Sequence, residues 1–423
     1  MIRKGYRYLL TAAAAASAAA LLTFAARNDF GLGRNMEIMV NMMRELSLSY
    51  VDPVDPDKLM EGAAEGMVRD LDPYTEFIPE EQMSDFELLT TGKYGGVGSL
   101  IRQKGDWVKI AQPYKGSPAD RAGLKIGDKI LAIDGKDAKG FTTEQVSSRL
   151  KGEPGSKVKV TVEHLDGSTE TVTLQRERIS IPGVPYTGWV ADGIGYIKLG
   201  QFARTTSAEM EQALASLRAE GVTKLIFDLR GNSGGYLDQA ILVANEFLHK
   251  EQLIVYTEDR HHQQQREYAD GTGSAQDMDV VVLIDEGSAS SSEILAGALQ
   301  DNDRGTIVGR RSFGKGLVQR QIPYSDGSAL RLTTARYYTP TGRSIQKPYT
   351  IGDDESYEED IWNRYRNNEF FSADSIHFAD SLKRTTPGGK VVYGGGGIMP
   401  DVFVPADTTD VTKYFVEVAG RNI

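Results

Sequence analysis

The segment from Val280 to Leu299 constrains the fold of this chain most strongly. Val280 to Ile284 is a run of five apolar, mostly β-branched residues, and the turn residues Asp285 to Ser288 follow it directly. A run of this length and composition is typical of a strand that is buried on both faces of a sheet. Glu293 to Leu299 then carry the apolar spacing of a helix that runs to about Gln300. We therefore expect a buried strand that turns sharply into a helix.

A second strand and helix of the same kind lie upstream. Lys224 to Leu229 reads as another buried strand, which is followed by the glycine-rich segment Arg230 to Gly235 and then by a helical pattern from Leu237 to Leu248. Ile194 to Leu199 and the helical pattern from Ser207 to Ala219 extend the alternation. Strands that alternate with helices predict an α/β fold with a βαβ core and an at least partly parallel sheet. Further strands are expected at Thr306 to Val308 and Ala329 to Tyr338.

Composition limits the classes of function. The 423 residues, of which 40% are hydrophobic and 25% charged, allow two or three globular domains. The net charge is −11, and it becomes −14 without the first 26 residues, which argues against a nucleic-acid partner. Cysteine is absent, which excludes disulfides, a thiolate metal site and a cysteine nucleophile. Because His261 and His262 lie in a polar run typical of an exposed loop, we expect neither a metal site nor a cofactor.

Two residues in the segment from Val280 to Gln319 have the chemistry of a nucleophile and its base. Ser290 lies where the strand passes into the helix, and the free amides of a helix N-terminus favour a developing negative charge there. The alternative is that the serines around it only cap the helix. Lys315 lies between Gly314 and Gly316, behind Phe313. Glycines allow close approach and burial disfavours the ammonium form, so this lysine is a candidate to accept a proton from a serine.

The two segments together resemble a known family. The sequences SASSSEI and FGKGLVQ, which carry Ser290 and Lys315, are similar to the signature of the C-terminal processing peptidases, also called tail-specific proteases. The resemblance implies that Ser290 is the nucleophile, Lys315 the general base and Gln319 the residue that orients the lysine. It also implies a catalytic core of the ClpP/crotonase-like type. By the same resemblance the backbone amides of Gly235 and Ser291 form the oxyanion hole, whereas the glycines alone are equally typical of a tight turn.

The N-terminal part divides into two predicted segments. In residues 1–27, basic residues precede an alanine-rich apolar run, which is typical of a signal peptide or an N-terminal membrane anchor. Residues 28–92 are expected to be a helical segment. Its methionines and other apolar residues from Met36 to Leu46 recur at helical spacing, and we interpret them as core rather than as a partner-binding groove. A second helix is expected from Pro56 to Leu71. The LDPY segment after it, Leu71 to Tyr74, resembles the segment that precedes the binding module in the family.

Residues 93–178 resemble a PDZ domain. Short strands are expected at Ser99 to Gln103, Val108 to Gln112, Lys129 to Ile133 and Val158 to Glu163, with a helix from Thr143 to Leu150. PDZ domains bind an extended C-terminal peptide beside a sheet edge, and amides of a glycine-rich loop receive its carboxylate. The resemblance gives that loop here as Gly95, Gly96, Val97 and Gly98, and it implies protein substrates with apolar C-terminal tails.

The remaining chain is expected to hold the catalytic core. Residues 179–346 form the core itself and end in a motif from Tyr337 to Gln346 that also matches the family. Residues 347–396 are a polar insertion, which we interpret as a surface excursion, with a substrate-gating lid as the alternative. Residues 397–423, which begin with the GIMPD segment from Gly397 to Asp401, complete the core.

These observations predict an exported serine endopeptidase with a Ser-Lys dyad that selects protein substrates by their C-terminal tail. It is expected in the cell envelope, on the periplasmic or outer side of the cytoplasmic membrane, and anchored or secreted through its N-terminal segment. An activating or adaptor protein and a homo-oligomer are open as further partners. Two other classes of function stay open. One is a catalytically silent PDZ adaptor on a protease-like fold, and the other is an esterase or amidase for small substrates, against which the PDZ module argues.

Overall fold

The computed structural model describes residues 31–83 and 93–407, and it divides the chain into two compact units, Met1–Asp70 and Leu71–Ile423. The first unit contains a helix over residues 31–49 and α2 (Pro56–Val68). Asp55 caps α2 by accepting a hydrogen bond from the amide of Asp57, and Pro56 begins the helix. The predicted helical segment runs on to residue 92, whereas the structure places the boundary after Asp70.

The interpretation of the methionine stripe as core is wrong. Met36, Ile38 and Met42 are 59%, 56% and 57% exposed. In the described residues of this unit only Ala64, on α2, is a buried hydrophobic. Helical spacing places apolar side chains on one face, but it does not supply the surface that would cover them.

No helix within residues 31–83 and 93–407 has the length and apolar composition needed to cross a membrane. The signal or anchor expected in residues 1–27 lies outside the described residues.

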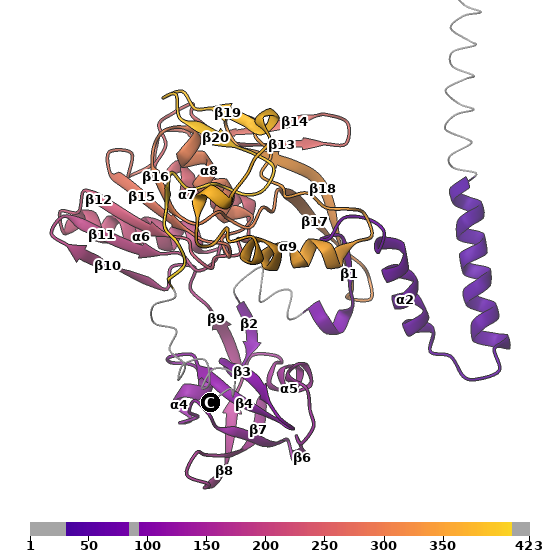
Figure 1. The fold of residues 1–423 in the computed structure, drawn as a ribbon. Helices are drawn as coiled ribbons and strands as arrows, with labels where there is room; N and C mark the ends of the chain where they lie inside the picture. Colours follow the sequence, from indigo (N-terminus) through magenta and orange to yellow (C-terminus); the bar gives the residue numbers. More distant parts are fainter. Residues whose placement is uncertain (1–30, 84–92, 408–423) are drawn as a thin grey trace, which may run out of the picture. The chain divides into compact units, whose positions relative to one another are not determined.

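The centre of the second unit is a six-stranded mixed sheet in the order β10-β11-β12-β15-β16-β21 (Figure 1). β10 (Tyr186–Ala191) is antiparallel to β11 (Ile194–Lys198). The pairs from β11 through β12 (Lys224–Asp228), β15 (Asp279–Ile284), β16 (Thr306–Gly309) and β21 (Val402–Phe403) are all parallel. The predicted α/β class is confirmed. Residues beyond 396 return to this sheet as β21.

Three helices connect the parallel strands. They are α6 (Thr206–Ala219), α7 (Leu237–Asn245) and α8 (Ser291–Asp301). Their apolar faces and the sheet form one core, with Phe202, Phe227 and Phe247 among its fully buried members. α8 is buried along its whole length. α7 ends three residues before the predicted limit.

A second sheet of five strands lies in the same unit. Its order is β1-β18-β13-β14, with β17 also paired to β18, and all of its pairs are antiparallel. The strands are β1 (Glu76–Ile78), β13 (Leu253–Asp259), β14 (Gln264–Tyr268), β17 (Leu317–Pro323) and β18 (Ala329–Tyr338). β17 begins two residues after Lys315 and β1 two residues after Tyr74, so this sheet positions both residues.

The PDZ region forms a separate sheet with its own core. The order is β3-β4-β5-β7-β8, with β6 (Lys136–Asp137) paired to β5, and a second pair joins β2 (Lys93–Gly96) to β9 (Glu177–Ser180). The strands are β3 (Ser99–Lys104), β4 (Trp107–Pro113), β5 (Lys129–Ile133), β7 (Lys157–Glu163) and β8 (Thr169–Gln175), with α4 (Pro118–Arg121) and α5 (Thr143–Leu150). β3 forms one end of this sheet, beside α5. Fifteen buried hydrophobic residues, such as Ile110 and Val160, make up the core.

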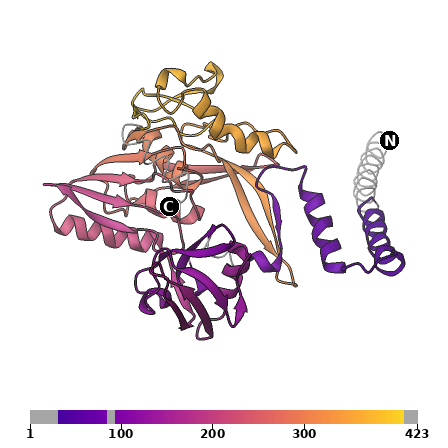
Figure 2. The same cartoon turned by 60° about the horizontal axis from the view of Figure 1, so that its bottom comes forward.

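The insertion forms α9 (Asp354–Arg366), two short 3-10 helices (Ala373–Ser375 and Asp380–Leu382), and the hairpin of β19 (Lys383–Thr385) and β20 (Val391–Tyr393). Figure 2 shows these residues, in gold, gathered on one side of the second unit. Asp353 caps α9, and acidic residues in its first turn and arginines in its last turn complement the helix dipole. Most of α9 is exposed, as expected for a surface excursion, but Tyr357 and Arg364 are buried.

Candidate active site

Ser290 lies in a sharp turn between β15 and α8. It is the N-cap residue of α8, with φ 54° and ψ −115°. A positive φ is uncommon in a residue with a side chain and costs on the order of 1–3 kcal/mol, which the surrounding structure must offset. The turn is held by the carboxylate of Asp285, which accepts hydrogen bonds from the amides of Gly287 (3.0 Å) and Gly231 (2.8 Å). The strained turn therefore holds Ser290 in a fixed place.

The glycine-rich turn after β12 lies directly against Ser290. A Cβ atom added to Gly234, whose φ is +105°, would lie 2.8 Å from the Cβ of Ser290 and 2.8 Å from the carbonyl oxygen of Ala289. Asn232, which is fully buried, accepts hydrogen bonds at its carbonyl from the amide of Ala289 and the hydroxyl of Ser292. Only a residue without a side chain at position 234 allows this approach.

Two backbone amides at this junction are free to bind an anion. The hydroxyl of Ser291 donates to the carbonyl of Gly235 (2.8 Å), which ties the helix start to the glycine turn. In the described part of the chain, neither the amide of Gly235 nor that of Ser291 has a hydrogen-bond acceptor. Both residues line one pocket with Ser290. Such amides, together with the positive end of α8, suit a developing oxyanion.

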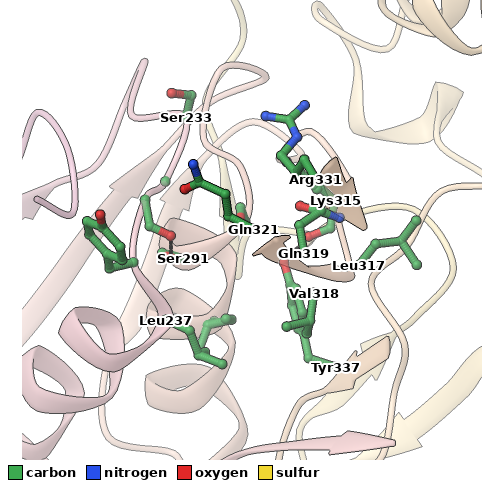
Figure 3. A pocket seen from close by; sticks show the side chains of 15 residues that line it. Ser233, Leu237, Ser291, Lys315, Leu317, Val318, Gln319, Gln321, Arg331 and Tyr337 are labelled. Atoms are coloured by element: carbon green, nitrogen blue, oxygen red, sulfur yellow. Dashed lines mark hydrogen bonds between the residues drawn. The ribbon is translucent and has the colours of Figure 1, made fainter. Parts of the chain in front are cut away.

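Lys315 lines the same pocket from the opposite side (Figure 3). Its Nζ lies 4.1 Å from the centre of the Tyr74 ring. The pKa of Lys315 is lowered to about 8, mainly by burial and also by the positive charge of Arg331, while Glu76, Glu293 and Asp72 act in the opposite direction. A lysine with this pKa is partly neutral near pH 7 and is able to accept a proton.

Glu293 connects the serine turn to the lysine loop. It is fully buried, and one carboxylate oxygen accepts hydrogen bonds from the amides of Ser290 and Lys315, both at 2.8 Å. The other oxygen accepts from the amide of Gly314 (2.7 Å) and the hydroxyl of Ser312 (2.5 Å). Burial raises the pKa of Glu293 to about 7, although these four donors favour its charged form. Sequence reasoning gave Glu293 no role, but its position three residues after Ser290 is that of a capping box.

Tyr337 is a further contact between the two sides of the site. Its side chain is buried, and its hydroxyl donates to the carbonyl of Lys315. Burial raises the pKa of Tyr337 well above its ordinary value, and a hydrogen bond with Ser290 partly offsets this effect. Tyr337 therefore contacts both the serine and the lysine residue, a role that its place in a strand motif did not reveal.

Gln319 lines the pocket with Lys315, but its side chain forms a hydrogen bond with a different residue. Its amide group donates to the hydroxyl of Thr333 (3.3 Å), which in turn donates to Asp72 (2.7 Å). Among the described residues no hydrogen bond joins Gln319 to Lys315. Its role in orienting the lysine stays a prediction.

The pocket has a volume of about 370 Å³. In Figure 3, Ser233, Ser291 and Leu237 lie on one side of it, and Lys315, Gln319 and Arg331 lie on the other. Within residues 31–83 and 93–407, no cluster of three or more histidine, aspartate or glutamate side chains has the arrangement of a metal site. The pocket brings together the hydroxyl of Ser290, the amine of Lys315 and two free backbone amides. These are the groups that catalyse acyl transfer.

Asp228, at the end of β12, organises the start of the glycine turn. Arg230 binds its carboxylate through two nitrogens, at 3.0 and 2.8 Å, and the hydroxyl of Tyr196 donates to it at 2.6 Å. Burial acts to raise the pKa of Asp228, but the bonds from Arg230 and Tyr196 outweigh it and hold the pKa at about 2. The carboxylate is therefore a fixed anchor for the loop that leads to Gly235.

The predicted peptide-binding loop lies just before β3 of the PDZ region. Gly95 and Gly96 are paired with β9, while Val97 is buried and its carbonyl accepts from the amide of Ala119. The carbonyl of Gly98 accepts from the amide of Tyr114 and the hydroxyl of Ser117. The loop therefore leads into the end strand β3, the edge along which an added peptide strand would pair.

Three family models match this chain. Peptidase family S41 matches residues 193–356, the PDZ domain matches residues 109–164, and the activating protease CtpB N-terminal domain matches residues 11–82. The first contains Ser290, Lys315 and Gln319.

Two curated relatives and one solved structure are similar to this chain. A probable CtpA-like serine protease of Staphylococcus aureus (strain COL) is 35% identical over 331 residues, which are 77% of this chain and 66% of the relative. One of Staphylococcus saprophyticus is 32% identical over 312 residues, 73% of this chain and 63% of the relative. The match therefore spans just under two thirds of the length of these relatives. The structure of a photosystem II D1 C-terminal processing protease is 30% identical, with 90% of each chain covered and a TM-score of 0.47.

Proposed function

Because this chain belongs to peptidase family S41, the serine proteases of C-terminal processing, we propose that it is an endopeptidase that cleaves protein substrates with Ser290 as nucleophile and Lys315 as general base. The observation that carries this proposal is one pocket lined by the strained Ser290 and by Lys315, which is half-buried and whose pKa is lowered to about 8. The catalytic core is then of the ClpP/crotonase-like type, which the parallel strands β11 to β21 support.

The first step is acylation of the serine. The neutral amine of Lys315 takes the proton of the Ser290 hydroxyl as its oxygen attacks the scissile carbonyl carbon. The resulting oxyanion is held by the amides of Gly235 and Ser291. When the tetrahedral intermediate collapses, the C–N bond breaks, and the ammonium of Lys315 returns the proton to the leaving amine. No metal ion is required, because the lysine supplies the base and the amides stabilise the negative charge.

The second step is hydrolysis of the acyl-enzyme. Lys315, neutral again, takes a proton from a water molecule that attacks the ester carbonyl. The oxyanion is held by the same two amides, and its collapse releases Ser290 when Lys315 returns the proton to the serine oxygen. Gln319 is proposed to orient the lysine through its side-chain oxygen, since its amide nitrogen already donates to Thr333.

The PDZ domain is proposed to select substrates by an apolar C-terminal tail. The tail would pair along β3 and place its carboxylate at the amides of Gly95 to Gly98. The glycine-rich loop before an end strand supports this assignment. Residues 1–27 are proposed to export the protein to the cell envelope and to anchor it there or be removed. An activating or adaptor protein is proposed as a further partner.

The decisive test is cleavage of an unfolded reporter protein with and without an apolar C-terminal tail. We expect wild-type protein to cleave both reporters, and the tail to lower KM. Ser290→Ala and Lys315→Ala are each expected to abolish cleavage while the circular dichroism spectrum stays unchanged. A Lys315→Ala variant with a near-normal rate would remove the dyad. Tail binding without cleavage by wild-type protein would favour the adaptor function.

A further inference from the structure

The insertion packs against the loop that carries Lys315. Tyr357, on α9, is 5% exposed, and its ring meets that of Phe313 edge-on, with ring centres 6.3 Å apart. Arg364, about two turns further along the same face of α9, is 3% exposed and donates to the carbonyls of Ser312 (3.0 Å) and Arg311 (2.6 Å). α9 therefore binds the backbone just before Lys315.

The Tyr357 hydroxyl reaches the lysine through Tyr74. The two hydroxyl oxygens are 2.6 Å apart, and the rings are perpendicular with centres 5.7 Å apart. The face of Tyr74 in turn covers the amine of Lys315 at 4.1 Å. Tyr74 thus lies between the insertion and the lysine and contacts both.

The same hydroxyl also reaches the backbone after the lysine. It accepts a hydrogen bond from the side-chain nitrogen of Gln346 (3.2 Å), whose oxygen accepts from the amide of Gly316 (2.8 Å). Lys347 binds the carbonyl of Tyr357 (2.8 Å) and lies over its ring. Tyr357 is therefore bonded towards both sides of Lys315, by way of Tyr74 and Gln346.

The position of the lysine makes such support necessary. Lys315 lies between two glycines, and Gly314 has a φ of +98°. Glycines permit many backbone conformations, and a lysine side chain has four rotatable bonds, so an unsupported amine would turn towards water. A base must instead stay within hydrogen-bond reach of the serine.

We propose that the insertion is a brace for the catalytic base, in which Tyr357 and Tyr74 are positioning residues that hold the amine of Lys315 in the pocket. The proposal rests on the proposed function, since it concerns the base of that reaction. It differs from both a surface excursion and a substrate-gating lid, because the insertion acts through fixed contacts with the lysine loop.

The test compares Tyr357→Phe and Tyr74→Phe, which keep the rings and remove one hydroxyl each. Tyr365→Phe is the matched control, because Tyr365 lies on the same helix and is 51% exposed. In full-length protein we expect either variant to lower kcat at pH 7 by about threefold to tenfold, the effect of one hydrogen bond, with KM unchanged. The double variant should be no slower than the worse single variant, because both remove the same bond. Tyr365→Phe should match wild type.

A second measurement reads the lysine directly. Competitive acetylation with mass spectrometry gives the pKa of Lys315 in the Ser290→Ala background, where no turnover is needed. Without the Tyr357 hydroxyl, water reaches the amine, so we expect its pKa to rise towards 10.5. The charged groups that face it (Arg331, Glu76, Glu293 and Asp72) are the same in all variants.

The outcomes separate the two proposals. If wild-type protein does not cleave the reporter but Tyr357→Phe raises the lysine pKa, the proposed function fails and the brace stands. If wild-type protein cleaves and Tyr357→Phe keeps both its kcat and its lysine pKa, the brace is overturned. The brace is also overturned if Tyr357→Phe lowers only the heat stability and leaves the pH profile of kcat unchanged, because a merely structural contact would not move that profile.

Discussion

The pH dependence of cleavage tests the site most directly. Burial is the main reason that the pKa of Lys315 falls from 10.5 to about 8. The shift corresponds to a cost of about 3 kcal/mol for charging the amine in the pocket, at about 1.4 kcal/mol per pKa unit. At pH 7 about one lysine in ten is then neutral, whereas about one in 3,000 would be neutral with the ordinary pKa. The rate should therefore rise with pH and level off above about pH 8.

Glu293 adds a second requirement at lower pH. Its carboxylate faces four donors, so protonation would leave one of them without an acceptor and loosen the turn that carries Ser290. Because its pKa is raised to about 7, Glu293 must lose its proton in the same range. The logarithm of kcat should thus rise with a slope near one between pH 7 and 8, and with a slope approaching two below pH 7.

The assay is single-turnover cleavage of a fluorogenic peptide between pH 5.5 and 9.5, with Ser290→Ala as the blank. Circular dichroism at each pH controls for unfolding. A profile that is flat across this range, or one that still rises without levelling off at pH 9.5, would refute the argument that burial makes Lys315 the base. A slope of one down to pH 5.5 would leave the lysine in place but refute the role given to the Glu293 charge.

Three further predictions concern neighbouring residues. Gly234→Ala should lower kcat at least about 100-fold and cost on the order of 1–3 kcal/mol of stability, because its Cβ would lie 2.8 Å from that of Ser290. Gly231→Ala is the control, because Gly231 shares the positive φ but its added Cβ meets open space. An equal loss of kcat in the two variants would contradict the steric argument. Asp228→Asn should lower the free energy of unfolding at pH 7 by about 2 kcal/mol, because the pKa of Asp228 in the folded protein is held at about 2. The stability that the carboxylate supplies is present above pH 3.8 and is lost as the pH falls through 2. Urea unfolding checks this, and a difference from wild type that persists unchanged at pH 2 would count against it. Glu76→Gln should lower the pKa of Lys315 and raise the rate slightly at pH 7, because it removes an acidic group that favours the ammonium; the effect is small since Glu76 is half exposed, and a slower variant with an alkaline-shifted profile would contradict it.

Local sequence patterns determined the elements that carry the site. Val280 to Ile284 and Lys224 to Leu229 predicted β15 and β12 to within a residue at each end, and Thr143 to Leu150 is α5 without change. These segments are predictable because a buried strand or an amphipathic helix is specified by residues that are close in sequence. The small residues around Ser290 and Lys315 likewise marked the turns that the structure brings to one pocket.

Only the tertiary structure decided what surrounds these turns. Tyr74 and Tyr357 are 283 positions apart, and neither carries a local signal that it meets the other or covers Lys315. The lowered pKa of Lys315 depends on burial, and Tyr74, whose ring covers the amine, lies 241 positions earlier in the chain. Conversely, Met36 and its neighbours have the spacing of a core face but no partner surface among the described residues. Periodicity fixes which side of an element is apolar, while burial, and with it the chemistry of a base, depends on what the rest of the chain places against that side.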